Sequence, residues 1–238
     1  MTTPAILVTG ASRGIGAAAV TALKTRDAKV IPQATSARDA DTLAADFADP
    51  AAPAQLWHAA LDRAGGEIDV LVNNAGIFEA SPLDGEDGDW LAAWERTLAI
   101  NLTASAQLSR LAVRHWQKRG VPGRIVHVAS RAGHRGDSPA HWHYAASKGG
   151  MLAMHKTIAR AYARDGILSF AITPGFTDTA MAGDYLASRG GPALLADIPL
   201  GRVADPEEIA GMIVYCALEA PASMTGTTLD ANGASYVR

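Results

Sequence analysis

The chain has 238 residues and a net charge of −3 at pH 7, with 48% hydrophobic and 19% charged residues, the balance of a globular protein that buries a sizeable core. Its basic residues are scattered, which argues against a nucleic-acid or anionic membrane surface. The chain has one cysteine, Cys216, so we expect no internal disulfide. It has no apolar run long enough to span a membrane and no basic segment followed by an apolar leader. We therefore expect a cytoplasmic protein.

The first predicted strand, residues 5–9, runs into a glycine turn and then into a helix that ends near residue 24. Gly10, Gly14 and Gly16 give the turn a G-x-x-x-G-x-G spacing. Glycine lets the backbone turn tightly and lets a ligand approach it, and the helix N-terminus offers N–H groups to a phosphate. A glycine turn between a strand and a helix therefore predicts a dinucleotide site.

The second predicted strand, residues 28–33, ends at Gln33 without an acidic residue. In dinucleotide folds an acid at this point holds the ribose 2′-hydroxyl, whereas arginine accommodates a 2′-phosphate. Arg13 and Arg38 lie nearby in the sequence. The stretch therefore favours NADP(H), while NAD(H) remains open because both arginines could be solvated surface residues.

The remaining elements alternate between helix and strand. Only about eight residues separate the second strand from a short third strand at residues 43–47, too few for a full crossover helix. Helices are predicted at residues 53–64, 89–118, 142–164 and 206–218, and strands at residues 68–72, 124–130, 167–173 and 227–230. This order predicts a single α/β, doubly wound Rossmann-type domain over residues 1–238, with a parallel sheet of about seven strands and helices on both faces.

Two segments depart from this regular pattern. Residues 176–200 have weak periodicity, and a connection of that length is usually functional, so we expect a substrate-side loop or lid. Asn101 lies inside the long helix at 89–118, where asparagine competes for backbone hydrogen bonds, and it marks a local irregularity.

A candidate catalytic group lies late in the chain. Tyr144 and Lys148 are four residues apart on a predicted helix, so their side chains share one face. A neighbouring cation lowers the pKa of a phenol from its usual value of ~10, which would let Tyr144 act as a general acid or base. Ser130 ends a predicted strand, where its hydroxyl could hold a substrate oxygen.

These motifs, in this order and spacing, resemble the short-chain dehydrogenase/reductase family in its compact branch. The resemblance spans nearly the whole chain. It rests on the glycine turn, the run Asn73, Asn74, Ala75 and Gly76, then Asn101, Ser130, the Tyr144/Lys148 pair, and Pro174 with Gly175. Residues 199–210 are similar to the corresponding segment of 3-oxoacyl-(acyl-carrier-protein) reductases and related ketoreductases.

The resemblance implies four catalytic roles. Tyr144 would protonate the carbonyl oxygen as hydride arrives from the nicotinamide. Lys148 would bind the nicotinamide ribose and lower the Tyr144 pKa, Ser130 would hold the substrate oxygen, and Asn101 would support a water that relays protons to Lys148.

The resemblance also implies the binding residues. The cofactor would contact Gly10, Ser12, Arg13, Gly14, Ile15, Gly16, Asp46, Phe47, Asn73, Ala75, Gly76, Tyr144, Lys148, Pro174, Gly175, Thr177 and Thr179. The substrate pocket would include His134, His141, His143 and Phe176. His141 and His143 are half a metal site at most, because no further ligand stands nearby at ligand spacing, so we expect no metal.

Three functions follow, in decreasing order of support. The first is NADPH-dependent reduction of a ketone, an aldehyde or a 3-oxoacyl group to a secondary alcohol. The second is NAD-dependent oxidation of a secondary alcohol or polyol, and the third is a non-catalytic nucleotide-binding scaffold on the same fold. In oligomeric relatives the long helices, here residues 89–118 and 143–164, pack against their copies, so we expect a homotetramer or homodimer with a small-molecule substrate as its other partner.

Overall fold

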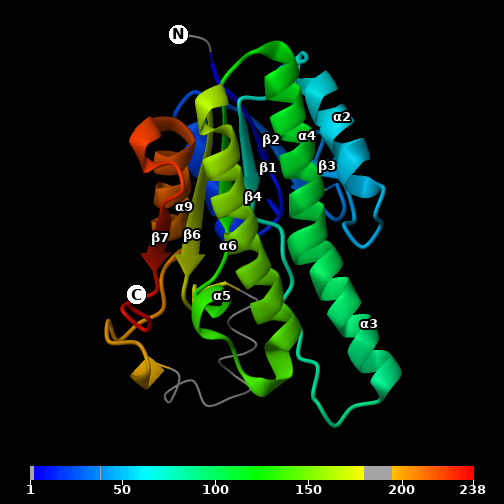
Figure 1. The fold of residues 1–238 in the computed structure, drawn as a ribbon, viewed down its shortest axis with the longest axis vertical. Helices are drawn as coiled ribbons and strands as arrows, with labels where there is room; N and C mark the ends of the chain where they lie inside the picture. The colour runs from blue at the N-terminus through cyan, green and yellow to red at the C-terminus, as the bar shows by residue number, and fades with distance from the viewer. Residues whose placement is uncertain (1–2, 38, 180–194) are drawn as a thin grey trace.

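The computed structural model of the chain describes residues 3–37, 39–179 and 195–238, and its strands form one parallel sheet in the order β3-β2-β1-β4-β5-β6-β7 (Figure 1). The strands are β1 (Ala5–Val8), β2 (Lys29–Ala34), β3 (Leu43–Ala44), β4 (Val70–Asn73), β5 (Gly123–Val128), β6 (Ile167–Pro174) and β7 (Thr228–Ala231). The predicted seven-stranded parallel sheet is confirmed.

The strand order reverses direction at β1. The chain first moves outward through β2 and β3, then returns to place β4 on the other side of β1. Val8 is in register with Pro32 on one side and with Val72 on the other. The segments that follow β1 and β4 therefore leave the sheet side by side, at the switch point where open α/β sheets bind ligands.

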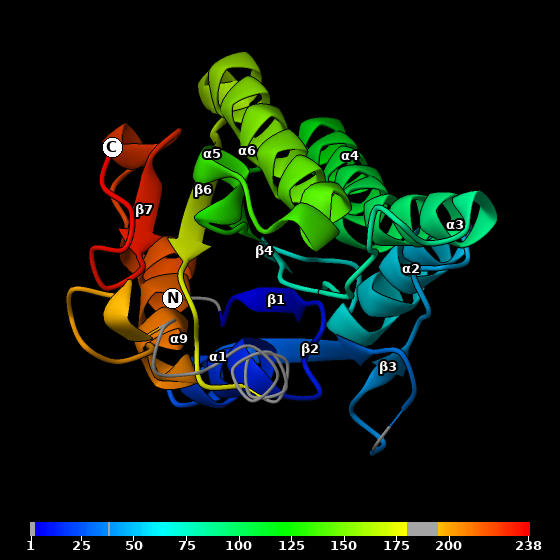
Figure 2. The same ribbon diagram turned by 90° about the horizontal axis from the view of Figure 1, so that it is seen from below.

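Helices cover both faces of the sheet (Figure 2). α1 (Gly14–Lys24) and α9 (Pro206–Val214) pack on one face, in a core with β-strand residues such as Ile6 and Val8. α2 (Ala52–Ala64), α4 (Ala104–Arg119) and α6 (Trp142–Tyr162) cover the other face. Leu7 points into this second core because successive strand residues face opposite sides. Within the described ranges, no helix combines the length and apolarity needed to cross a membrane.

The long helix predicted for residues 89–118 contains an interruption. α3 (Asp87–Leu98) passes into α4 through a π-helix, Ala99–Thr103, which contains Asn101. The Asn101 side chain is fully buried and bonds to the backbone of Ile77: its Oδ1 accepts from the Ile77 N–H at 2.8 Å and its Nδ2 donates to the Ile77 carbonyl at 3.0 Å. The irregularity predicted at this residue is confirmed.

Other boundaries differ from the predictions. β3 has two residues rather than five, because the side chain of Asp46 accepts the Ala48 N–H at 3.0 Å and turns the chain away. The sequence pattern did not reveal several short turns: α5 (Ala132–Arg135) and the 3-10 helices Pro139–His141, Ala163–Asp165 and Ala222–Met224. The helix α9 continues as a π-helix, Tyr215–Glu219. Arg38 and residues 180–194, most of the predicted lid, lie outside the described residues.

Candidate active site

A cavity of about 550 Å³ lies at the carboxyl ends of the central strands. Segments that follow β1, β2, β4, β5 and β6 line it, together with the start of α6. Its lining includes, from the predicted site, Gly10, Ser12, Arg13, Gly14, Ile15, Gly16, Asp46, Phe47, Ala75, Gly76, Ser130, Tyr144, Lys148, Pro174, Gly175, Phe176, Thr177 and Thr179. Segments far apart in the sequence thus meet at one edge of the sheet.

The glycine turn is locked against the segment that follows β4. Gly10 has φ +66°, and a Cβ there would lie 2.7 Å from the Cα of Ala75. The Asn74 side chain donates to the carbonyls of Thr9 and Gly10 at 2.8 and 3.1 Å. Arg13, the residue before α1, provides no side-chain cap, so no capping side chain occupies the first N–H groups of the helix, and these groups suit an anionic group.

Gln33 lines the cavity, but its side-chain amide is engaged in hydrogen bonds within the fold. Its side chain is buried, accepts the Gly10 N–H at 2.9 Å and donates to the Ala45 carbonyl at 2.7 Å. The residue therefore ties the glycine turn to the end of β3. Thr35 and Asp46 are neighbouring side chains with hydrogen-bonding groups that also line the cavity.

Ser130, Tyr144 and Lys148 meet at the opposite end of the cavity. The hydroxyls of Ser130 and Tyr144 are hydrogen-bonded to each other. Lys148 Nζ donates to the Val128 carbonyl at 2.9 Å and lies 5.7 Å from the centroid of the Tyr144 ring. The predicted spacing on one helix face thus brings an acid, a hydroxyl and an ammonium together.

Burial controls the charge of these groups. Although the Tyr144 side chain is partly exposed in the cavity wall, desolvation of its hydroxyl raises its pKa to about 12, and the hydrogen bond with Ser130 offsets only part of this rise. Burial lowers the pKa of Lys148 to about 8. Desolvation is the largest influence on the Tyr144 hydroxyl in this structure, and the lowering of its pKa by Lys148 stays a prediction.

Asn101 stands behind the cavity wall rather than in it. A Cβ on Gly76 would lie 3.3 Å from Asn101 Oδ1 and 3.5 Å from Lys148 Nζ, so the two polar groups flank the same glycine. Asn101 Nδ2 also donates to the Ser147 hydroxyl at 3.2 Å, and that hydroxyl donates to the Tyr144 carbonyl at 2.7 Å. Asn101 therefore connects the β4 segment to the helix that carries Tyr144.

Comparison with known proteins agrees with this geometry. A family model described as "Enoyl-(Acyl carrier protein) reductase" matches residues 10–233. The chain belongs to the short-chain dehydrogenase/reductase family. It is therefore an oxidoreductase that interconverts CH–OH and carbonyl groups with NAD(P).

Two known proteins are similar to this chain over nearly its whole length. The 3-oxoacyl-[acyl-carrier-protein] reductase FabG of Vibrio cholerae is 36% identical over 97% of this chain and 96% of its own length. Nodulation protein G of a Rhizobium species is 35% identical over 95% of this chain and 94% of its own length.

Two solved structures share the fold. A putative NAD(P)-dependent gluconate 5-dehydrogenase from Beutenbergia cavernae, with bound NADP at low occupancy, has a TM-score of 0.87 and 29% identity over 98% of this chain and 96% of its own. A putative 2-deoxy-D-gluconate 3-dehydrogenase from Agrobacterium tumefaciens, with bound NADP, has a TM-score of 0.84 and 28% identity over 97% and 95% of the two chains.

One residue of the family motif lies too deep for cofactor contact. Asn73 is fully buried, and its Nδ2 donates to the Ser109 hydroxyl at 3.0 Å across to α4. It is the last residue of β4, so its side chain points into the core, whereas Asn74 lines the cavity. The cavity lining therefore includes Asn74 and not Asn73, which the sequence had predicted.

The three histidines predicted as pocket walls also lie outside the lining. His141 stacks on the hidden face of Phe78 at 4.0 Å between ring centroids, and His134 stacks on Tyr236 at 5.7 Å. His143 is buried. The histidines support the wall from behind because the short turns after β5, which the sequence pattern did not reveal, fold them away from the cavity.

Other side chains form the wall in their place. Phe78 lines the cavity and packs edge-on against Tyr144 at 4.7 Å between ring centroids, and Arg131 and Arg135 line it beside Ser130. Their only sequence signals were adjacency to the Asn-Asn-Ala-Gly run and to Ser130. In the part of the chain that the structure describes, no group of three or more histidine, cysteine, aspartate or glutamate side chains lies close enough to hold a metal ion.

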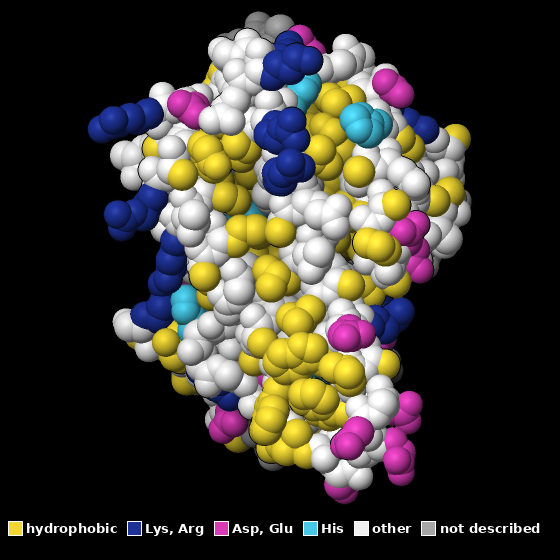
Figure 3. Space-filling model, turned by 45° about the vertical axis from the view of Figure 1, so that its right-hand side comes forward, with side chains coloured by type: hydrophobic (Ala, Val, Ile, Leu, Met, Phe, Trp, Pro, Cys, Tyr) yellow, Lys and Arg dark blue, Asp and Glu magenta, His cyan; other side chains and the backbone are white. Residues whose placement is uncertain are grey.

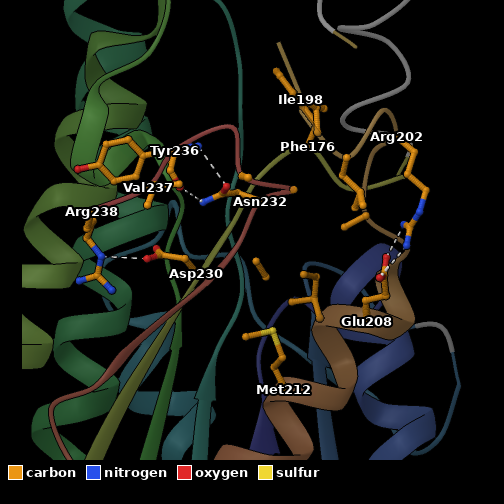
Figure 4. Close-up of a pocket in the computed structure, with 16 residues that line it drawn as sticks. Phe176, Ile198, Arg202, Glu208, Met212, Asp230, Asn232, Tyr236, Val237 and Arg238 are labelled. Atoms are coloured by element: carbon orange, nitrogen blue, oxygen red, sulfur yellow. Dashed lines mark hydrogen bonds and ion pairs between the residues drawn. The ribbon is translucent and has the colours of Figure 1, made fainter. Parts of the chain in front are cut away.

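A second cavity of about 550 Å³ lies at the end of β7 (Figure 4). Phe176 lines both cavities and so separates them. Ion pairs between Asp230 and Arg238 and between Arg202 and Glu208 stand on its two sides. No predicted site residue other than Phe176 lines this second cavity.

Proposed function

We propose that the chain is an NADPH-dependent reductase of a ketone, an aldehyde or a 3-oxoacyl group. The observation that carries the proposal is the single cavity that joins the uncapped start of α1 to the Ser130–Tyr144 hydrogen bond and to Lys148. The first group suits a pyrophosphate, and the second suits a carbonyl oxygen that gains a proton.

The cofactor, when bound, supplies a hydride to the carbonyl carbon. Ser130 holds the carbonyl oxygen by a hydrogen bond. Tyr144 gives its hydroxyl proton to that oxygen, and its pKa of about 12 keeps the proton on the phenol until the oxygen becomes basic. Lys148 stabilises the phenolate that remains, and Asn101 supports the water that returns a proton.

The cofactor contacts that we propose come from the segments after four strands. Gly10, Ser12, Arg13, Gly14, Ile15 and Gly16 would hold the pyrophosphate side, Asp46 and Phe47 the adenine, and Ala75, Gly76, Pro174, Gly175, Thr177 and Thr179 the nicotinamide side. The absence of an acid at Gln33, together with Arg13 on the rim, favours NADP(H).

The substrate has two candidate classes. The relatives named as 3-oxoacyl-[acyl-carrier-protein] reductases favour reduction of a 3-oxoacyl group. The solved structures named as gluconate dehydrogenases favour oxidation of a polyol, with NAD(P) as acceptor. A non-catalytic scaffold is disfavoured because Tyr144 and Lys148 are both present and share one cavity.

Titration of the purified protein with NADPH and NADH, followed by nicotinamide fluorescence, tests the cofactor. We expect tighter binding of NADPH. Binding of neither nucleotide would overturn the proposed function.

Replacement of the proposed acid tests the chemistry. Tyr144→Phe should bind NADPH as the wild type does and lower kcat about 10²–10⁴-fold, because it removes the general acid and keeps the ring. Retention of near-full turnover would assign the proton transfer to another group.

The domain and its setting are also part of the proposal. Residues 1–238 would form one catalytic domain, with residues 176–200 as the lid over the substrate. We place the protein in the cytoplasm, where its thiol stays reduced: Cys216 is buried, and burial raises its pKa to about 11, so the thiol is unreactive.

The apolar surface favours a homotetramer. Figure 3 shows hydrophobic side chains gathered over the lower part of the face formed by α3, α4 and α6. Leu91 on α3, Trp142 at the start of α6 and Leu83 in the segment before α3 are about half exposed, and Trp90 stacks on Trp94 at 5.4 Å between ring centroids. An exposed patch of this kind is typical of a protein interface, which supports packing of these helices against those of another copy.

A further inference from the structure

Arg131 has a place in the cavity that the proposed mechanism does not use. It follows Ser130 directly and lines the cavity, and only 8% of its surface is exposed. Its backbone N–H donates to the Pro174 carbonyl at 3.1 Å. The end of β6 therefore fixes the position of Arg131 beside the hydroxyl that would hold the substrate oxygen.

Phe176 sets the direction of the Arg131 side chain. The guanidinium carbon lies 4.8 Å from the centroid of the Phe176 ring, a distance typical of a cation stacked on an aromatic face. The ring lies between the two cavities and appears with Ile198 in the wall of the second (Figure 4). A ring packed in this way holds the guanidinium plane in one orientation.

The Arg131 guanidinium is a planar, permanently charged group in the cavity wall. It carries five N–H donors in one plane, so it can keep a contact at one edge and bind a carboxylate through another. Paired N–H groups match the two oxygens of a carboxylate, a match that lysine cannot make. Arg131 and Ser130 are consecutive residues that line the same cavity, so one small substrate could contact both side chains.

The charges around Arg131 narrow the possible position of an anion. Arg135 also lines the cavity, and its Nη1 donates to the Ser235 carbonyl at 3.2 Å. Asp137 and Asp197 also line the cavity and repel a carboxylate that approaches them. Arg131 is the cation that directly adjoins Ser130 in the chain.

We propose that the substrate carries a free carboxylate within a few bonds of its carbonyl group, and that Arg131, oriented by Phe176, binds this carboxylate. The proposal rests on the proposed reductase function and narrows its substrates to oxo acids, or to hydroxy acids in the reverse direction. Arg131 would then select an oxo acid over the corresponding ester or thioester, whose carboxyl group has no charge.

A 3-oxo acid and its methyl ester form a suitable pair of probes because they share the ketone and differ in the negative charge. Steady-state kinetics with NADPH would give kcat/KM for each probe. We expect the wild type to prefer the acid at least tenfold, and Arg131→Met to lower the acid-to-ester ratio at least tenfold. Arg131→Lys, which keeps the charge and loses the paired donors, should give an intermediate ratio.

Arg114→Met is the matched control, because Arg114 is an exposed arginine on α4, and it should leave the ratio at its wild-type value. NADPH titration of each variant shows whether it is folded. Turnover of the ester by the wild type with a ratio near one, or an unchanged ratio in Arg131→Met, would overturn the assignment of Arg131 and leave the reductase function standing. Turnover of neither probe by an enzyme that binds NADPH would count against the reductase function itself, and this inference would fall with it.

Discussion

At the scale of single residues, burial sets the charges on which the chemistry depends. Desolvation keeps the proton on Tyr144, with a pKa of about 12, and weakens the hold of Lys148 on its own proton, with a pKa of about 8. The acid is thus fully protonated at neutral pH, while the cation beside it lies close to its titration.

The low pKa of Lys148 predicts pH-dependent cofactor binding. Below about pH 8 the ammonium is present and attracts the anionic nucleotide; as the pH rises through about 8 the charge is lost, so the Kd for NADPH should increase. Fluorescence titrations between pH 6.5 and 9.5 would measure this. Lys148→Met should bind NADPH more weakly and with a flat profile over the same range, and an equally steep profile in that variant would exclude Lys148 as the titrating group.

Two buried histidines lie deeper in the core. His127 on β5 and His155 on α6 are fully buried, with ring centroids 5.8 Å apart. His155 Nδ1 is hydrogen-bonded to the Ser169 hydroxyl at 2.8 Å, and Asn73 Nδ2 lies 3.4 Å from His127 Nδ1. Burial lowers the pKa of His127 to about 3 and that of His155 to about 4, so both are neutral in the folded protein.

The histidines predict a loss of stability in acid. The unfolded chain takes up these protons below pH ~6.5, whereas the folded protein does so only near pH 3–4, so stability is complete above pH 6.5 and falls as the pH decreases. At pH 5 each histidine should cost about 2 kcal/mol. Urea unfolding at pH 7.5 and pH 5 would measure the difference, which should shrink in His127→Asn and persist in His58→Gln, a change at an exposed position of α2. An equal acid loss in His127→Asn would contradict the assignment.

At the scale of elements, the start of α1 shows how one helix is placed for an anion. Gly16 lies inside the helix, and a Cβ there would fall 2.1 Å from the Gly10 carbonyl oxygen. The helix can therefore approach the strand end only with glycine at this position. Glycine elsewhere is not always required: around Gly211 in α9, nothing lies within 4 Å of the corresponding Cβ position.

These two glycines form a matched pair for substitution. Gly16→Ala should lower the free energy of unfolding by about 1–3 kcal/mol through overpacking and should weaken NADPH binding, because the turn must shift. Gly211→Ala should raise the free energy of unfolding by about 0.5–1 kcal/mol, since alanine is the better helix former. Urea unfolding of both variants gives the comparison, and a similar effect in the two would show that the close approach at Gly16 is not limiting.

At the scale of the whole molecule, the face formed by the packed helices α3, α4 and α6 exposes apolar side chains. α3 and α6 pack against each other, and their exposed side chains include Leu91 and Trp142. Tyr144 lies on α6 and Asn101 in the π-helix between α3 and α4, so packing between copies would stabilise the elements that hold the proposed catalytic groups.

The assembly prediction concerns mass in solution. Light scattering should give about four times the chain mass of 24.7 kDa. Leu91→Arg combined with Trp142→Arg should lower the mass to that of a dimer or monomer, because charges at a buried apolar interface are costly. His58→Arg, on the exposed side of α2, should keep the wild-type mass. A monomer mass for the wild type would remove the tetramer.

The sequence alone determined the alternation of strands and helices, the glycine turn before α1 and the shared helix face of Tyr144 and Lys148, because these depend on spacing along a few residues. Tertiary structure decided the rest. It buried Gln33 and Asn73 as links within the fold, stacked His141 on Phe78 and raised the pKa of Tyr144. It also set Arg131 on Phe176, which lies on a different strand end. Desolvation and contacts between distant segments arise only when the chain is packed, so no local pattern records them.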